Sequence, residues 1–314
     1  HRVVHGGDRF HAPTRLTPAV LTTLEAVSAL APLHNPPALA GIRAAQAALG
    51  PAVPQVVVFD TTFYTTLPPV AFTYALPAAL TAQYNIRRYG FHGIAHAALL
   101  AGYCAARAIP PAAATIITLQ LGGGCSATAI RQGQAVDTSM GFTPLEGLVM
   151  GTRAGDLDPA LPAFLARQTG ATLDDVDQLL NHEAGLRGIA GGNGDMRELL
   201  ARRAGDPQAA LAVDLFCYRA RKYIGAYLAV LGGAQALVFG GGIGEHAPVI
   251  RAEICAGLEW AGVQLDPARN QAATGGAARI SADAARISVY VVPVDEAAAI
   301  ATATVACLRN ADRD

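Results

Sequence analysis

The sequence has few charged and few aromatic side chains, and this scarcity excludes several classes of protein. Charged residues make up 15% of the 314-residue chain and aromatic residues 6%, whereas 52% are hydrophobic. An intrinsically disordered tail needs the opposite balance. The net charge of −1 gives no basic field that would attract a nucleic acid or an anionic membrane surface. The length allows one large or two ordinary domains with a sizeable core.

Lysine is almost absent, because Lys222 is the only lysine among 23 basic residues. The guanidinium of arginine binds carboxylates and phosphates with a rigid fork, so this bias suits a protein that handles anions. A GC-rich coding sequence would produce the same bias and would also raise the alanine content.

Paired cysteines and long apolar runs are missing too. The cysteines are scattered without a CxxC pair, at Cys104, Cys125, Cys217, Cys255 and Cys307. Such thiols are typical of reduced, buried side chains, so we expect a cytoplasmic protein. No apolar stretch reaches the ~18 residues that a membrane span needs, so we expect no membrane partner. The chain starts at His1 in a segment typical of a strand that runs into a turn, from which we expect a missing N-terminal piece.

The pattern of apolar residues predicts an α/β protein. Short β-branched runs predict strands over residues 55–60, 115–121, 126–130, 135–138, 236–239 and 287–292. Helical patterns cover residues 37–49, 94–108, 159–231, 248–261 and 295–308. The three strands between 115 and 138 predict a meander, and Asp174 and Asp206 are the predicted N-caps of two helices.

Two glycine-rich loops each follow a buried strand, at Gly122–Gly124 and at Gly240–Gly244. Glycine lets backbone N–H groups approach phosphate oxygens, so the pair predicts two clamps on one polyphosphate, although one such loop often only turns the chain. Residues 242–247 also match the GxGxxA dinucleotide pattern. Their late position and the lack of a suitably spaced ribose-binding acid argue against a dinucleotide.

Charged residues in unusual surroundings are candidates for chemistry. Arg153 lies between Gly151 and Gly155, where it is well placed to reach an anion, and Arg2 lies in an apolar strand. Asp60 and Glu296 offer carboxylates for Mg²⁺, which takes one or two protein carboxylates plus substrate phosphates. The first-turn position of Glu296 is also favoured by the helix dipole alone.

Histidine offers a weaker signal. His92 and His96 have a spacing that metal ligands can share, but no third ligand is near in the sequence. A histidine that hydrogen-bonds an anionic intermediate is the favoured interpretation of His92. His5, His11 and His34 share no spacing, and we assign them no role.

Together these segments resemble the acetate kinase (acetate/propionate kinase) family, within the actin-like ATPase and sugar-kinase superfamily. The resemblance covers nearly the whole chain. It is carried by Arg2–Gly7 (RVVHGG), Phe59–Tyr64 (FDTTFY), Arg88–His96 (RYGFHGIAH), Asp137–Pro159, Asp195–Arg197, Phe239–Glu245 and Val294–Ala297.

The resemblance implies an α/β fold of two lobes with a cleft, the first lobe truncated. Residues 1–62, with a helix over 297–314 packing back, would form the first lobe, and residues 63–296 the nucleotide-binding lobe. It further implies a homodimer and reversible, Mg²⁺-dependent phosphoryl transfer from ATP to the carboxylate of acetate, giving acetyl phosphate and ADP. A propionate kinase and a non-catalytic nucleotide-binding fragment are the alternatives.

The resemblance also implies roles for single residues. Arg2 and Arg153 would hold the carboxylate and the phosphoryl group, His92 would hydrogen-bond the phosphoryl oxygens, and Asp60 and Glu296 would order Mg²⁺. Val4, Leu33 and Pro144 would form an apolar pocket for the substrate methyl. The nucleotide would contact Gln120, Gly122, Gly123, Gly124, Asp195, Met196, Arg197, Gly240, Gly241, Gly242, Ile243 and Gly244.

Three departures from the family pattern stand out. Gln120 and Gly123 occupy the places of the histidine and the asparagine in the family's H-L-G-N-G loop, so a side-chain donor is lost at Gly123. Val294 and Ala297 replace polar residues beside Glu296. The family's N-terminal N-x-G-S-S-S-x-K loop is nowhere in the chain, which favours the fragment alternative.

Overall fold

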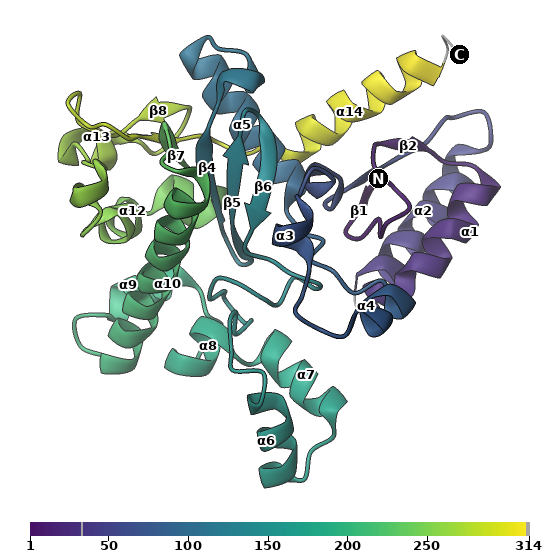
Figure 1. Ribbon diagram of the computed structural model, residues 1–314, viewed down its shortest axis with the longest axis horizontal. Helices are drawn as coiled ribbons and strands as arrows, with labels where there is room; N and C mark the ends of the chain where they lie inside the picture. The colour runs from purple at the N-terminus through teal and green to yellow at the C-terminus, as the bar shows by residue number, and fades with distance from the viewer. Residues whose placement is uncertain (33, 312–314) are drawn as a thin grey trace.

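The computed structural model describes residues 1–32 and 34–311, and it contains two β-sheets covered by helices (Figure 1). The smaller sheet has the order β1-β3-β2, with β1 (Arg2–Val3), β3 (Val56–Phe59) and β2 (Thr14–Arg15). β1 runs parallel to β3, and β2 antiparallel to it. The strand predicted to end at Asp60 is therefore the central strand of this sheet.

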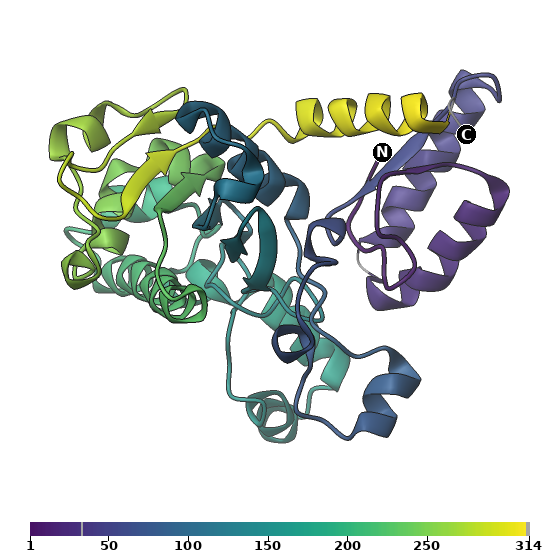
Figure 2. The same cartoon turned by 45° about the horizontal axis from the view of Figure 1, so that its top comes forward.

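Helices cover both faces of the smaller sheet, which explains why β3 is apolar throughout. Val57 and Phe59 pack with α1 (Pro18–Val27) and α2 (Asn35–Leu49). Val56 and Val58 point the other way and pack against α14 (Glu296–Ala311). Figure 2 shows α14, in yellow, reaching from the larger sheet to this smaller unit. The two ends of the described chain thus lie in one unit.

The larger sheet has six strands in the order β6-β5-β4-β7-β9-β8. Their bounds are β4 (Ile116–Leu121), β5 (Cys125–Arg131), β6 (Gln134–Thr138), β7 (Ala236–Gly240), β8 (Ala278–Arg279) and β9 (Ser288–Val291). The predicted meander is confirmed, since β4, β5 and β6 pair antiparallel, whereas β4, β7 and β9 are parallel.

Alternate residues of the larger sheet face different helices, as the two-residue period of a strand requires. Ile116 and Val238 pack with α5 (Gly93–Arg107), whereas Ile117 and Leu237 pack in the main core with α10 (Pro207–Leu231). The mixed α/β class predicted from the sequence is confirmed.

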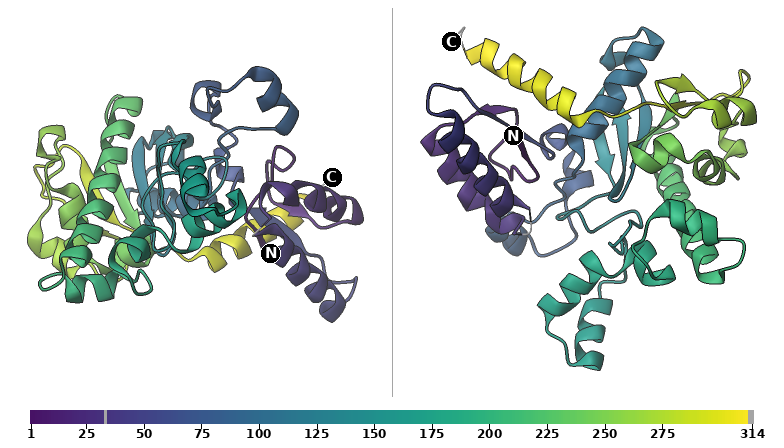
Figure 3. Two further views of the ribbon diagram at one scale, coloured as in Figure 1. Left: turned by 90° about the horizontal axis from the view of Figure 1, so that it is seen from below. Right: turned by 180° about the vertical axis from the view of Figure 1, so that it is seen from behind.

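The remaining helices are α3 (Pro69–Phe72), α4 (Ala78–Tyr84), α6 (Leu161–Thr169), α7 (Leu173–His182), α8 (Gly185–Ala190), α9 (Met196–Arg202), α11 (Gly241–His246), α12 (Pro248–Cys255) and α13 (Pro267–Ala272). Figure 3 shows the α6–α7 pair, in teal, extending away from the sheets. None of the helices within the described ranges is both long and apolar enough to cross a bilayer.

Three local predictions were wrong. The expected loop Gly240–Gly244 instead ends β7 and begins the short helix α11. The helix expected over 248–261 ends at Cys255, because Gly257 takes a φ of 81°, and a separate 3-10 turn follows at Glu259–Ala261. Asp174 is a first-turn residue of α7, whose N-cap is Thr172, whereas the side chain of Asp206 caps α10 as predicted.

Candidate active site

Two carboxylates from distant parts of the chain meet at Arg2. Arg2 Nη2 donates to Asp60 Oδ2 at 2.5 Å and Arg2 Nε to Asp60 Oδ1 at 3.2 Å. Glu296 Oε2, on the first residue of α14, lies 3.5 Å from Arg2 Nε. The parallel pairing of β1 with β3 brings Arg2 to Asp60, because Arg2 lies beside Val58 in the register. The two carboxylates predicted to order a cation therefore approach the same positive group.

Asp60 is held rigidly. Its side chain is 1% exposed, its backbone oxygen accepts from Gly93 N at 2.9 Å, and its N–H donates to Val3 O. Burial raises the pKa of the Asp60 carboxyl to about 6; Arg2 opposes this rise and Glu296 adds to it. At neutral pH Asp60 is thus an ionised carboxylate at a fixed position.

A second group forms where Arg153, His92 and Gly124 converge. A Cβ placed on Gly124 would lie 3.2 Å from His92 Nε2 and 3.6 Å from Arg153 Nη1, so these two side chains face one small space. Arg153 donates to Pro144 O at 3.3 Å, and no carboxylate pairs with it in the described part of the chain. Burial lowers the pKa of Arg153, the expected effect for a cation without a counter-charge.

Arg2 of the first group and Arg153 of the second both influence the pKa values of the same histidines. Burial, together with the charges of Arg2 and Arg153, lowers the pKa of His92 to about 3. Burial is the main cause that lowers the pKa of His34, at the start of α2, and the charges of the same two arginines add to it. Neutral imidazoles and two guanidinium groups thus line a positive region that suits an anion.

The predicted nucleotide residues surround a cavity of about 600 Å³. Gly122 and Gly123 reach it from the end of β4, Asp195, Met196 and Arg197 from the start of α9, and Gly242 and Ile243 from α11. Three segments that the sequence places far apart therefore meet at one cavity.

Five other predicted nucleotide residues do not line this cavity. Gly240, Gly241 and Gly244 pack inward; Gly241 has a φ of 75°, and a Cβ there would lie 2.6 Å from Leu121 O. Its N–H donates to Glu245 Oε1 instead of lining the cavity. Gly124 faces His92, and Gln120 is half-buried with an Oε1 atom that has no hydrogen-bond partner among the described residues.

Asp195 and Arg197 form a preassembled edge of the cavity. Asp195 caps α9 by accepting from Arg197 N at 2.8 Å, and it pairs with the Arg197 guanidinium at 2.6 Å. These hydrogen bonds lower the pKa of Asp195 to about 2. The motif thus folds back on itself and presents an ion pair at the cavity rim.

The predicted apolar pocket is only partly described. Leu33 lies outside the described residues. Val4 is partly buried against the main core, and Pro144 lines a smaller cavity of about 250 Å³ together with Pro32 and His34. Pro144 also contacts Arg153 through its carbonyl oxygen, so this cavity adjoins the positive region.

The contacts of His92 and His96 do not support the hypothesis that they are metal ligands. His92 Nδ1 and His96 Nε2 each lie 2.8 Å from Ser126 Oγ. Over the ranges described, no group of three or more His, Cys, Asp or Glu side chains could hold a metal ion. The sequence reasoning missed Ser126, and it missed His34, which its neighbour Leu33 in the predicted pocket could have signalled.

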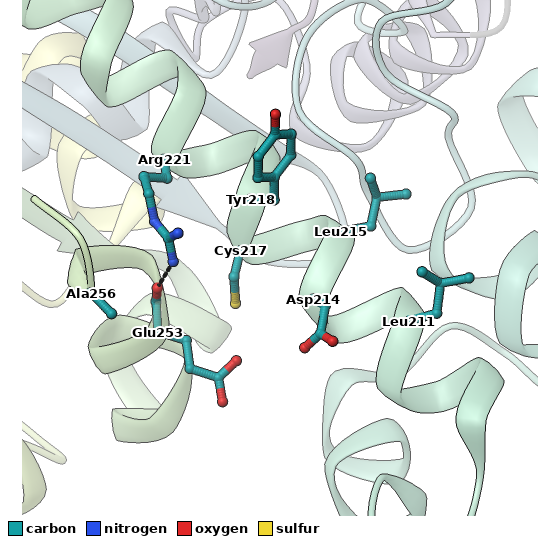
Figure 4. Close-up of a pocket in the computed structure, with 8 residues that line it drawn as sticks. All are labelled: Leu211, Asp214, Leu215, Cys217, Tyr218, Arg221, Glu253 and Ala256. Atoms are coloured by element: carbon teal, nitrogen blue, oxygen red, sulfur yellow. Dashed lines mark hydrogen bonds between the residues drawn. The ribbon is translucent and has the colours of Figure 1, made fainter.

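A further pocket is lined by residues of α10, by Glu253 of α12 and by Ala256, which follows α12 (Figure 4). Its charged groups are already engaged, since Arg203 pairs with Asp214 and Glu253 and Arg221 donates to backbone oxygens of Glu253 and Ile254. It offers a ligand no unpaired charged group among the described residues, so the space shared by Arg153 and His92 is the better candidate.

Comparison with known proteins agrees with this geometry. The chain is 52% identical over 310 residues to an acetate kinase from Solibacter usitatus, covering 98% of this chain and 75% of that protein. It is 50% identical over 307 residues to an acetate kinase from Streptomyces coelicolor, with 98% and 75% covered.

Solved structures lead to the same group. The acetate kinase of Porphyromonas gingivalis matches with a TM-score of 0.93 and 40% identity, covering 98% of this chain and 77% of that one. A propionate kinase from Francisella tularensis matches with a TM-score of 0.92 and 39% identity, covering 97% and 77%. The model of the acetokinase family matches residues 1–302. The chain belongs to the acetokinase family.

Proposed function

We propose that this protein transfers the terminal phosphoryl group of ATP to the carboxylate of acetate, reversibly, giving acetyl phosphate and ADP. The observation that carries the proposal is the convergence of Arg153 Nη1 and His92 Nε2 on one small space, with Arg2 acting on the same histidine. Gly122 and Gly123 lead from this space into the cavity proposed for the nucleotide.

The residues suit a reaction between two anions. A carboxylate is already ionised at neutral pH, so the attacking group needs no general base. The difficulty is to bring it to a phosphoryl group that is also negative. Arg2 and Arg153 would neutralise and align the two partners, and neutral His92 would donate a hydrogen bond to an equatorial oxygen of the phosphoryl group.

The donor set also fits Mg²⁺. Carboxylate oxygens of Asp60 and Glu296 already approach one cationic group, and hard oxygen ligands are those that Mg²⁺ prefers. When bound, Mg²⁺ would reduce the negative charge on the nucleotide phosphates. Buried Asp60, together with Glu296 from α14, would hold the ion.

Propionate is the alternative substrate, because one structural neighbour is a propionate kinase. An apolar pocket that includes Val4 and Pro144 would accept a methyl or an ethyl group. One methylene is worth only about 1–3 kcal/mol in such a pocket, so both acids are expected to react with modest discrimination.

The wider assignment follows the family. Residues 1–62 with the C-terminal helix form one lobe, residues 63–296 form the other, and two copies associate as a homodimer. The free cysteines are consistent with a reducing cytoplasmic location. Size-exclusion chromatography with light scattering should give twice the chain mass of 32.3 kDa; a single chain mass would contradict the dimer.

A hydroxamate assay with acetate, ATP and Mg²⁺ tests the activity. Acyl phosphate should accumulate with acetate, and more slowly with propionate. Binding of ATP without any acyl phosphate would reject transfer by this chain and support the nucleotide-binding fragment instead.

A further inference from the structure

A row of four polar side chains, joined by hydrogen bonds, runs from the partly buried His92 of the candidate site into the protein. His92 Nδ1 lies 2.8 Å from Ser126 Oγ, which lies 2.8 Å from His96 Nε2, and His96 Nδ1 lies 2.7 Å from Thr118 Oγ1. Ser126, His96 and Thr118 are each fully buried. The resemblance assigned a role to His92 alone, and the proposed reaction does not use the other three.

The fold explains why these side chains meet. Thr118 of β4 and Ser126 of β5 share the sheet face that α5 covers, because both alternate with residues of the main core. His96 reaches this face from the first turn of α5, four residues after His92. His92 has a φ of 58°, so its backbone turns at the start of α5.

The hydrogen atoms shared by these four side chains can be assigned by counting donors and acceptors. Thr118 Oγ1 has no hydrogen-bond partner other than His96 among the described residues, so its hydroxyl hydrogen is satisfied only if Thr118 donates to His96 Nδ1. Neutral His96 then carries its hydrogen on Nε2 and donates to Ser126. Ser126 in turn donates to His92 Nδ1, which leaves the hydrogen of His92 on Nε2.

We propose that Ser126, backed by His96 and Thr118, is a positioning residue that fixes His92 as the neutral tautomer with its hydrogen on Nε2. That nitrogen faces the space shared with Arg153 Nη1, so two donors point at one spot. The opposite tautomer would present a lone pair to the bound anion. The catalytic consequence rests on the proposed phosphoryl transfer, but the tautomer does not.

The surroundings keep both rings neutral. Burial lowers the pKa of His92 to about 3, aided by Arg2 and Arg153, and burial with the neighbouring His92 lowers the pKa of His96 well below its usual value. A protonated His92 would donate from both nitrogens and would compete with the Ser126 hydroxyl. Each imidazole therefore carries a single ring-nitrogen hydrogen, as the assignment of the hydrogen atoms requires.

Nitrogen NMR of the ¹⁵N-histidine-labelled chain without substrate reads the tautomer directly. His92 and His96 should each show a protonated Nε2 and a hydrogen-bonded Nδ1, with signals assigned by their loss in His92→Gln and His96→Gln. In Ser126→Ala the Nδ1 signal of His92 should shift toward that of a free acceptor. A hydrogen on His92 Nδ1 in the unaltered chain, or no shift in Ser126→Ala, would overturn the inference and leave the proposed function untouched.

Kinetics provide the second readout. Ser126→Ala should lower kcat by about tenfold or more, with the KM for ATP within about twofold, and should add little loss on top of His92→Ala. Ser126→Cys keeps the volume with a weaker donor and should fall between. Thr128→Val removes another buried hydroxyl from β5 and is the matched control, expected to keep the NMR signals and kcat.

Equal losses of kcat in Thr128→Val and Ser126→Ala, or losses in Ser126→Ala and His92→Ala that add up in the double variant, would show that Ser126 acts through general packing and would reject the positioning role. If no variant, including the unaltered chain, forms acyl phosphate, the proposed function fails while the NMR result still decides the tautomer.

Discussion

At the scale of single residues, Arg153 is notable for what it does not contact. It is half-buried, and within the described part of the chain its guanidinium donates to the Pro144 carbonyl and the Met150 sulfur. A guanidinium in this state loses hydration without gaining a counter-charge. An anion that reaches it gains a strong, two-pronged partner, which identifies Arg153 as a group kept ready for a ligand.

Replacing Arg153 by alanine should therefore affect transfer more than nucleotide binding. We expect kcat to fall by about 10³-fold, while the Kd for ATP changes by no more than about threefold, because the nucleotide cavity is lined by other residues. Arg167→Ala on α6 is the control. Parallel losses of kcat and ATP affinity would show that Arg153 has a structural role.

Gly123 offers a test in the opposite direction. Among the described residues, a Cβ at Gly123 would meet no atom within 4 Å; its φ is not positive, and the residue lines the cavity proposed for the nucleotide. Gly123→Asn therefore adds a hydrogen-bond donor without strain, and we expect kcat to rise by about tenfold in the hydroxamate assay. Gly275→Asn, also at an open position, should leave kcat unchanged. A fall in kcat for Gly123→Asn would mean that the glycine itself is required.

The residues of the site were predictable where a motif carries them, and not where only the tertiary structure does. Arg2, Asp60 and Glu296 were named from the sequence, and the structure brings them together. Ser126 was not, because a serine in a buried strand has the same pattern whether it fills space or binds a histidine; only its distance to His92 and His96 distinguishes the two.

At the scale of elements, the short helix α11 depends on a buried cation from the next helix. Arg251 of α12 is fully buried and donates to the Gly244 and Glu245 carbonyls at the end of α11, and to Asn270 and Ala273 beyond it. A cation suits a helix C-terminus, where carbonyl oxygens lack partners. Arg251 thus connects α11, which lines the cavity proposed for the nucleotide, to α13.

Removing this cation should destabilise the chain and loosen the cavity. Arg251→Met leaves several buried carbonyls without a donor, so we expect the free energy of unfolding to fall by about 3 kcal/mol in urea titrations, with weaker ATP binding. Arg43→Met removes an exposed pair with Glu25 and should cost under about 1 kcal/mol. Unchanged ATP affinity in Arg251→Met would show that α11 does not need this contact.

Most long elements could be predicted from their apolar period, including β4, β7, α5 and α10. The failures share a cause. Gly240–Gly244 has the composition of a loop, yet the chain becomes helical at Gly241. Gly241 has a φ of 75° and packs closely against Leu121, which permits a sharp turn there. Local helix or strand propensity does not reveal such a turn. The two-residue strands β1, β2 and β8 are likewise too short to show a period.

At the scale of the whole molecule, buried histidines couple stability to pH. Burial lowers the pKa of His5 to about 4 and that of His92 to about 3, below the usual 6.5. As the pH falls through 6.5, the unfolded chain takes up protons that the folded chain refuses, so stability decreases. Asp60 acts in the opposite sense, because its raised pKa of about 6 lets the folded chain bind a proton first.

The histidines should outweigh Asp60. His5 alone is expected to contribute a loss of about 2 kcal/mol in the free energy of unfolding between about pH 7 and pH 5. In His5→Phe this part of the pH dependence should disappear, although losing the acceptor for Gly7 N lowers stability equally at both pH values. His11→Phe, at an exposed position, should keep the full dependence. An identical slope in His5→Phe and the unaltered chain would contradict this assignment.

The chain passes between its two sheets twice, once just after β3 and once just before α14. Asp60 stands at the first passage and Glu296 at the second, and Arg2 contacts both. Because these two crossings lie side by side, they permit one sheet unit to rotate against the other about the line that joins the crossings. They resist sliding of the two units past each other. Residues on such a line move least. The carboxylates would therefore keep their spacing, while residues farther from this line, such as Pro144 and the glycines that follow β4, would move through a wider arc.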